Sequence, residues 1–362
     1  IARGAWEAGV RVAAAYPGTP STEILENVAR FPEEDIVAQW STNEKVALDV
    51  AMGASFQGVR ALAVMKHVGL NVAADALMSM TYIGVNGGLV IVVCDDPGIH
   101  SSQNEQDTRV FARFAMVPVL EPSDAEEALE FTRMAFDLSE KFDTPVILRS
   151  TTRLSHTRSP VALGERIGVV RRKFDENPKK NVMIPSHARI RHPVLIEREK
   201  KLAEFFETFE QTRWEKAGTS VGVVTAGISY GYVKEVLPNA SVLKLAGSYP
   251  LPEKAIRDFA ASVDRLLVVE ELEPAIETQL KAWHLDVGGK EFFSRVGELS
   301  PELVRDGFIQ AGVLPKEAGV ADVFEIEPTP RPPVLCPGCP HTSSYMVLRQ
   351  VDARVAGDIG CY

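Results

Sequence analysis

The sequence predicts an α/β protein with doubly wound, mainly parallel sheets. Short runs of β-branched and apolar residues alternate with longer amphipathic stretches. This alternation is typical of parallel strands that helices cover on both faces. The pattern occurs twice, and a basic, proline-containing segment separates the two occurrences. With 362 residues, the chain is long enough for two or three domains.

The first block of alternating elements spans residues 1–155. Its predicted strands are Val10–Ala15, Ala61–Met65, Leu89–Cys94, Met116–Leu120 and Pro145–Arg149. Its predicted helices are Ile1–Gly9, Ser21–Arg30, Asn43–Gln57, Gly69–Ile83 and Asp124–Lys141. Strands that are apolar along their whole length indicate a parallel sheet buried on both faces.

The segment 156–216 has a different composition, with 14 Lys and Arg against nine Asp and Glu. We expect a linker that ends in an amphipathic helix over Ile196–Lys216 and places Leu202, Phe205, Phe206 and Phe209 on one face. A solvated surface explains the basic excess most simply, and a seat for an anionic partner or coenzyme phosphates is the alternative.

A second α/β block covers residues 217–327, and a third begins at 328 after a proline-rich connector and stops at Tyr362. The second block's predicted strands are Gly222–Thr225, Ser241–Lys244 and Arg265–Glu270. The first residues already form a helix pattern, and the last break off in a strand-to-loop motif. We therefore expect a piece of a longer polypeptide.

Composition argues against several classes of protein. Hydrophobic residues make up 45% and charged residues 24%, which is ordinary for a globular protein with a core. The net charge of −10 argues against a nucleic-acid binder. No apolar run reaches the ~18 residues that a membrane helix needs. Four cysteines are too few for a disulfide framework, so we expect a reducing, cytoplasmic environment.

Two motifs precede predicted helices, and the first of them also follows a predicted strand, the place where open α/β sheets bind ligands. In the first, Tyr16–Ser21 (Tyr-Pro-Gly-Thr-Pro-Ser), Thr19 is either a helix N-cap followed by Pro20 or a ligand contact. In the second, Ser41–Glu44 (Ser-Thr-Asn-Glu), a capping box is one interpretation. A buried Glu44 carboxyl group bound to a cofactor ring nitrogen is the other.

Two further motifs follow apolar strands. Lys66 and His67 directly follow the strand Ala61–Met65. At such a strand end, His67 has either a structural or a reactive role. The loop Asp95–Ser102 contains two Asp and one His, but its spacing matches no common metal-ligand set. We assign no metal ligand there.

Near the end, Cys336 and Cys339 form a Cys-Pro-Gly-Cys-Pro-His motif, and Cys361 follows downstream. A CxxC pair suggests zinc, a redox pair or an iron–sulfur cluster. A tetrahedral site needs four ligands, and a second CxxC is absent from the sequence. We therefore favour a loop that lines another ligand and predict that these cysteines do not jointly hold a metal.

Taken together, these motifs resemble the large subunit of the indolepyruvate type of thiamine-diphosphate-dependent 2-oxoacid:ferredoxin oxidoreductases. The motifs that carry the resemblance are Tyr16–Ser21, Asn43–Ala47, Lys66–Asn71, Asp95–Gly98, Cys336–His341 and Gly357–Cys361. The resemblance spans nearly the whole chain, and the motifs occur in the family's order. It implies an aminopyrimidine-binding domain first, a transketolase C-terminal-like domain second, and the start of a diphosphate-binding domain third.

The resemblance also implies roles for individual residues. Glu44 would hydrogen-bond N1′ of the aminopyrimidine and so activate C2 of the thiazolium. Thr19 would lie over the substrate carboxylate, and Lys66 and His67 near the reacting carbon. The residues that would face thiamine diphosphate from the third block are Gly338, Cys339, Asp358, Gly360 and Cys361.

The activity that the resemblance implies is conversion of an aryl 2-oxoacid to an aryl-acyl-CoA, with reduction of ferredoxin. The implied cofactors are thiamine diphosphate, magnesium and iron–sulfur clusters, and the partners are a smaller subunit, ferredoxin and coenzyme A. The family's magnesium motif and cluster cysteines are absent from these 362 residues. A pyruvate or 2-oxoglutarate oxidoreductase, or a non-catalytic assembly subunit, remains the alternative.

Overall fold

The computed structural model describes residues 1–316, 335–351 and 353–356. Residues 1–315 form one compact unit, and the remaining described residues belong to a second unit. No helix in the described ranges is long and apolar enough to cross a membrane.

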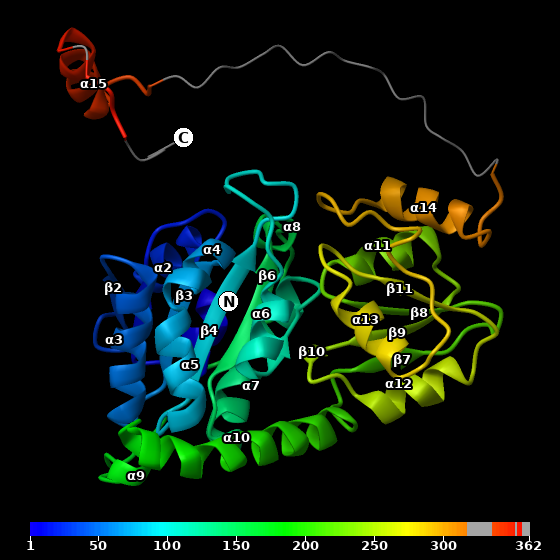
Figure 1. Cartoon of the computed structure of the whole chain (residues 1–362), viewed down its shortest axis with the longest axis horizontal. Helices are drawn as coiled ribbons and strands as arrows, with labels where there is room; N and C mark the ends of the chain where they lie inside the picture. The colour runs from blue at the N-terminus through cyan, green and yellow to red at the C-terminus, as the bar shows by residue number, and fades with distance from the viewer. Residues whose placement is uncertain (317–334, 352, 357–362) are drawn as a thin grey trace. The chain divides into compact units, whose positions relative to one another are not determined.

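The first half of the large unit contains a seven-stranded sheet of order β10-β5-β6-β4-β3-β1-β2, whose edge strand β10 (Gly247–Tyr249) comes from the second half (Figure 1). Its elements along the chain are α1 (Ala2–Glu7), β1 (Val12–Ala15), α2 (Thr22–Val28), β2 (Val37–Trp40), α3 (Glu44–Phe56), β3 (Ala61–Lys66), α4 (His67–Val72), α5 (Ala74–Ile83), β4 (Leu89–Asp95), α6 (Thr108–Ala115), β5 (Val119–Leu120), α7 (Ala125–Phe142), β6 (Val146–Thr151) and α8 (Thr152–Ser155). All pairings are parallel except that of β10 with β5. The predicted doubly wound, mainly parallel sheet is therefore confirmed.

Both faces of this sheet are buried, which explains the continuous apolar runs of its strands. In β3, Leu62 and Val64 contribute to one core cluster, while Ala61, Ala63 and Met65 contribute to the other. The first cluster includes residues of α1, α2 and α7, and the second includes residues of α3, α4, α5 and α6. Alternate side chains of a strand point to opposite faces, so helices on both sides require apolar residues at every position.

The basic segment contains α9 (Pro178–Asn181) and α10 (Pro185–Phe206). Figure 1 shows α10 as one long helix that passes along the first half and leads toward the second. It begins earlier than Ile196 and ends before Lys216, and Arg213–Glu215 is the strand β7. Both bounds of the predicted helix are therefore wrong: the helix continues N-terminally through Pro193, and the chain forms a strand before it reaches Lys216. Of the predicted apolar face, Leu202, Phe206 and Phe209 are buried and Phe205 is partly buried.

The second half has a four-stranded sheet of order β11-β8-β9-β7, in which only β7 pairs antiparallel. Its elements are β7 (Arg213–Glu215), β8 (Gly222–Ala226), α11 (Ser229–Val236), β9 (Ser241–Leu245), β10 (Gly247–Tyr249), α12 (Glu253–Ala260), β11 (Leu266–Val269), α13 (Ala275–Ala282) and α14 (Pro301–Gln310). Strand β10 leaves this half and joins the first sheet beside β5. The second unit contains α15 (His341–Gln350).

Two predicted elements of the first half differ from the structure, and further observed elements were not predicted. Met116 is the left-handed C-cap of α6 (φ 56°), so the strand is limited to Val119–Leu120. The predicted helix Gly69–Ile83 is two helices, α4 and α5, that meet at Ala73. The edge strand β2 and the helix α6 were not predicted. Because β2 is mostly exposed, it lacks the apolar run that marks the other strands.

Candidate functional site

The candidate site lies at the carboxyl ends of β1, β3 and β4. The registers pair Ala15 with Val64 and Lys66 with Cys94, so the segments that follow these strands start at one edge of the sheet. Helix α3 enters at the same edge after β2, because Trp40 is paired with Ala15. Parallel pairing therefore gathers the predicted motifs around Thr19, Glu44, Lys66 and Asp95 from separate parts of the sequence.

Glu44 is the first residue of α3, and its side chain is only 8% exposed. The N-cap is Asn43, whose side-chain oxygen accepts a hydrogen bond from Val46 N at 2.9 Å. The predicted capping box of Ser41 and Glu44 is wrong, and the buried Ser41 Oγ has no hydrogen-bond partner among the described residues. The carboxyl group is thus not committed to capping the helix through Ser41.

Burial raises the pKa of Glu44, and hydrogen bonding to its own backbone N–H and the charge of Lys66 partly oppose this rise. No other group in the described ranges donates a hydrogen bond to this carboxyl group. Gly69 of α4 lies against it, since a β carbon at that position would stand 2.5 Å from Oε1. A buried carboxyl group with free acceptor capacity can bind a polarised N–H of a ligand.

Lys66 ends β3 and points its ammonium group at the loop after β4. Its Nζ donates to the carbonyl of Ser101 at 2.6 Å. Burial lowers the pKa of Lys66, while the charges of Asp96 and Glu44 oppose that change. The loop after β1 packs on its stem, because a β carbon on Gly18 would lie 2.9 Å from Cδ.

Asp96 fixes the start of the loop after β4. Burial raises the pKa of its carboxyl group, but hydrogen bonds from Thr152, Ser102 and the backbone of Ser101 outweigh this effect, so the pKa lies below its usual range. Asp96 is therefore an ionised, hydrogen-bonded anchor close to Lys66. This role was not predicted, because its partner Thr152 lies far away in sequence.

His67 begins α4 and is 2% exposed. Its Nε2 lies 3.1 Å from the carbonyl oxygen of Asn104, and Nδ1 lies 3.5 Å from that of Cys94. His67 also lines a cavity of about 490 Å³ with Leu70, Phe111 and other residues. Both ring nitrogens thus face backbone carbonyls, and the ring is held by the loop that covers it.

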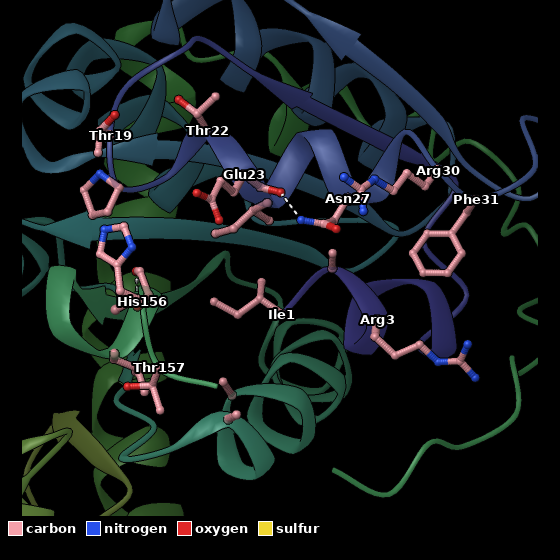
Figure 2. A pocket seen from close by; sticks show the side chains of 18 residues that line it. Ile1, Arg3, Thr19, Thr22, Glu23, Asn27, Arg30, Phe31, His156 and Thr157 are labelled. Carbon is pink, nitrogen blue, oxygen red and sulfur yellow. Dashed lines mark hydrogen bonds between the residues drawn. The ribbon is translucent and has the colours of Figure 1, made fainter. Parts of the chain in front are cut away.

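The interpretation of Thr19 as a helix N-cap is wrong. The helix begins at Thr22 after the N-cap position Ser21, and Thr22 Oγ1 accepts from Gly18 N at 2.8 Å. Thr19 lines a different cavity, of about 530 Å³, and not the one beside His67. Figure 2 shows Thr19 and Thr22 on one side of this cavity and His156 on the opposite side.

Of the residues predicted in the third block, Gly338 and Cys339 lie in the described part of the second unit. Gly338 has φ +79°, and Cys339 Sγ is 3.4 Å from His341 Nδ1. Asp358, Gly360 and Cys361 lie outside the described residues. Within the described ranges, no three His, Cys, Asp or Glu side chains are arranged to hold a metal ion.

A buried charge network joins the two halves of the large unit and was not predicted. Arg109 pairs with Asp107 at 2.6 Å and with Glu270 at 2.7 Å. Arg149 pairs with Asp95 at 2.6 Å and with Glu121 at 2.8 Å. No spacing in the sequence could reveal this network, because Arg109 and Glu270 are 161 positions apart.

Comparison with known proteins gives a family match over the first part of the chain. The model of the family described as pyruvate flavodoxin/ferredoxin oxidoreductase, thiamine diphosphate-binding, matches residues 3–219. The indolepyruvate oxidoreductase subunit IorA of Archaeoglobus fulgidus is 44% identical over 100% of this chain and 62% of its own length. The subunit of that name from Thermococcus kodakarensis is 44% identical over 100% and 60%. The chain thus spans about three fifths of these relatives.

Two solved structures share the fold at low sequence identity. A 2-oxoglutarate:ferredoxin oxidoreductase from Magnetococcus marinus, with 2-oxoglutarate, coenzyme A and succinyl-CoA bound, matches with a TM-score of 0.68 and 16% identity over 86% of this chain and 64% of that chain. A split-gene transketolase, described as an inactive β4 tetramer, matches with a TM-score of 0.53 and 17% identity over 86% and 96%. These likenesses support the α/β fold alone.

Proposed function

The chain belongs to the pyruvate flavodoxin/ferredoxin oxidoreductase family, and from this membership we propose that the full-length protein oxidatively decarboxylates 2-oxoacids with thiamine diphosphate and reduces ferredoxin. Relatives named indolepyruvate oxidoreductase favour aryl 2-oxoacids as substrates and aryl-acyl-CoA as product. A substrate such as 2-oxoglutarate is the second candidate, because the 2-oxoglutarate synthase subunit KorA of Methanothermobacter marburgensis is 29% identical over 49% of this chain and 49% of its own.

We propose a separate role for each of three parts of the chain, namely the two sheet-containing halves and the C-terminal segment. We assign aminopyrimidine binding to residues 1–155, a transketolase C-terminal-like role to 217–327, and the start of diphosphate binding to 328–362. The family match over residues 3–219 supports the first assignment. We also propose that five residues of this last segment face the thiamine diphosphate, namely Gly338, Cys339, Asp358, Gly360 and Cys361.

The observation that supports the proposal best is the environment of the Glu44 carboxyl group. Its carboxyl group is buried, its pKa is raised by burial, and it accepts only from its own backbone N–H within residues 1–316. A ring nitrogen that shares a proton with this group would satisfy it. The residues present therefore fit the aminopyrimidine of thiamine diphosphate.

Thiamine diphosphate, when bound, supplies the carbon nucleophile and the electron sink for decarboxylation. Glu44 holds a proton at N1′ and so sets the protonation state of the ring. Lys66 places a positive charge at the same edge, 2.6 Å from the carbonyl of Ser101, and is proposed to bind substrate with Thr19. His67 is proposed to lie near the reacting carbon, with its ring oriented by the Asn104 carbonyl, 3.1 Å from Nε2.

Metal-dependent steps are assigned to none of the described residues, because no cluster of three possible ligands occurs among them. The magnesium and iron–sulfur ligands remain proposals for the full-length protein. The same holds for its partners, a smaller subunit, ferredoxin and coenzyme A, and for its cytoplasmic location. The relatives' description as subunits supports an assembly of more than one chain type.

The test is Glu44→Gln in the full-length complex, with the exposed Glu26→Gln as its matched control. Gln preserves the shape and removes the charge, so turnover with indolepyruvate should fall by about 10²-fold, and calorimetry should show weaker binding of thiamine diphosphate. The melting temperature without cofactor should stay unchanged. Turnover and cofactor affinity within two-fold of the control would refute a role for Glu44 in cofactor activation. Wild-type complex that is inactive toward indolepyruvate, pyruvate and 2-oxoglutarate would refute the proposed function.

A further inference from the structure

The loop that connects β4 to α6, residues 96–107, covers the two basic residues of the candidate site. Ser101 accepts a hydrogen bond from Lys66 Nζ at 2.6 Å, and the Asn104 carbonyl lies 3.1 Å from His67 Nε2. These contacts leave Lys66 8% and His67 2% exposed. The loop's backbone carbonyls thus decide where both side chains point.

The second half of the large unit holds this loop through Glu105. One oxygen of the carboxylate, Oε1, accepts from Gly98 N at 2.6 Å within the loop and from Gly297 N at 3.0 Å in the segment between α13 and α14. A single carboxylate therefore closes the base of the loop and fastens it to a segment 192 residues away.

Glu298 makes the reciprocal contact from the second half. Its carboxylate pairs with the guanidinium group of Arg153, with Nε at 3.1 Å from Oε2, and Oε1 lies 3.4 Å from His100 Nε2 on the loop. Arg153 belongs to α8, directly after the end of β6. Each half thus supplies one carboxylate to the other, and both contacts meet at the 96–107 loop.

We propose that Glu105 and Glu298 are positioning residues, through which the second half holds the 96–107 loop so that its carbonyls orient Lys66 and His67. This inference rests on the proposed function of that site. It assigns a positioning role to the second half, because Gly297 and Glu298 bind Glu105 and Arg153 at the carboxyl edge of the first sheet. It also predicts that loosening either carboxylate frees Lys66 and His67 without unfolding the protein.

The size of the effect follows from the exposure of the contacts. Hydrogen bonds to charged groups are stronger than neutral ones, but Arg153 is about half exposed and solvent screens its pair. We therefore expect loss of one carboxylate to raise the open population of the loop by about three- to ten-fold.

The first experiment measures the loop directly in the full-length complex. Glu105→Gln, Glu298→Gln and the exposed control Glu302→Gln are treated briefly with acetic anhydride, and acetylation of Lys66 is quantified by mass spectrometry beside amide exchange of residues 97–106. Acetylation and exchange should rise three- to ten-fold in the first two variants and stay at the wild-type level in Glu302→Gln. Wild-type labelling of Lys66 in both Gln variants would overturn the inference.

The second experiment separates positioning from stability. Turnover and KM for the 2-oxoacid are measured for the same variants, and Glu298→Asp tests rescue by a retained charge. A lower kcat at unchanged melting temperature, restored at least in part by Asp, supports the proposal. Faster Lys66 labelling with unchanged kcat and KM would overturn the positioning role and leave the proposed function intact. Wild-type complex inactive toward every 2-oxoacid tested would overturn the proposed function, and the positioning role with it.

Discussion

Gly69 and Glu44 are in such close contact that no other residue fits at position 69 without displacing the carboxyl group. A β carbon on Gly69 would lie 2.5 Å from Oε1 and 2.7 Å from Cδ of Glu44. Gly69 is not among the glycines with positive φ, so it is required for space and not for backbone conformation. The contact joins the first turn of α4 to the first turn of α3 and fixes where the carboxyl group can lie.

Gly69→Ala should therefore impair activity more than folding. Alanine favours the helix by about 0.5–1 kcal/mol over glycine, and the atoms it meets are the end of a flexible side chain. The melting temperature should change little, while displacement of Glu44 by about 1 Å should lower turnover by about 10²-fold. Gly53→Ala in α3, where a β carbon meets nothing within 4 Å, is the matched control. Equal turnover in the two variants would show that the contact is irrelevant to the chemistry.

The second prediction concerns the N-cap of α3 and the stability of the protein, not its activity. Asn43→Ala removes the acceptor for Val46 N and should cost about 0.5–2 kcal/mol in the free energy of unfolding, measured by urea denaturation. Ser41→Ala should be neutral, because Ser41 Oγ has no partner among the described residues. The reverse order of the two variants would restore the capping box and contradict the observed N-cap.

The core of the first sheet could be predicted because burial on both faces leaves a local signal. All six residues of β3 are buried, and its apolar run stands out without any knowledge of its neighbours. The same argument placed Lys66 and His67 at the carboxyl edge. Elements without such a run, the exposed strand β2 and the helix α6 with its left-handed end at Met116, were missed.

The details of the candidate site could not be predicted, because they depend on contacts between distant segments. The capping-box interpretation placed the cap of α3 at Ser41, but the backbone places it at Asn43, which is extended at φ −165°. Likewise, nothing near Lys66 in the sequence points to Ser101, 35 positions away. The roles of Glu44, Thr19, Lys66 and His67 themselves stay predictions.

The basic segment gives a third prediction, since part of it is not the solvated surface that its composition suggested. Arg198 is buried, and its Nη1 donates to the carbonyl of Thr81 at 2.6 Å near the end of α5. Arg198→Leu would leave this buried carbonyl unpaired and should cost about 1–3 kcal/mol by urea denaturation. The exposed Arg189→Leu should change stability by less than about 0.5 kcal/mol. If Arg198→Leu also changed stability by less than about 0.5 kcal/mol, the hydrogen bond of Arg198 would not contribute to holding α10 in place.

Glu271 gives the last prediction, a pH dependence of stability. Its carboxyl group is 3% exposed and accepts from Leu299 N at 3.1 Å. Burial raises the pKa of Glu271 to about 7, although the Leu299 N–H and the charge of Arg149 oppose the rise. The folded protein therefore binds this proton more tightly than the unfolded chain does.

The sign of the effect follows from proton linkage. Between the ordinary glutamate pKa near 4.5 and the raised value of about 7, the folded state holds the proton and the unfolded state releases it, so stability falls as pH rises through this window. Glu271→Gln cannot ionise and keeps an oxygen that accepts from Leu299 N. Its unfolding free energy should match that of the wild type near pH 4.5 and exceed it above pH 7, by a difference of about 3 kcal/mol. Urea denaturation at pH 5, 6, 7 and 8 measures this difference, with the exposed Glu26→Gln as control. A difference that stays constant from pH 5 to pH 8 would show that Glu271 is already ionised in the folded protein.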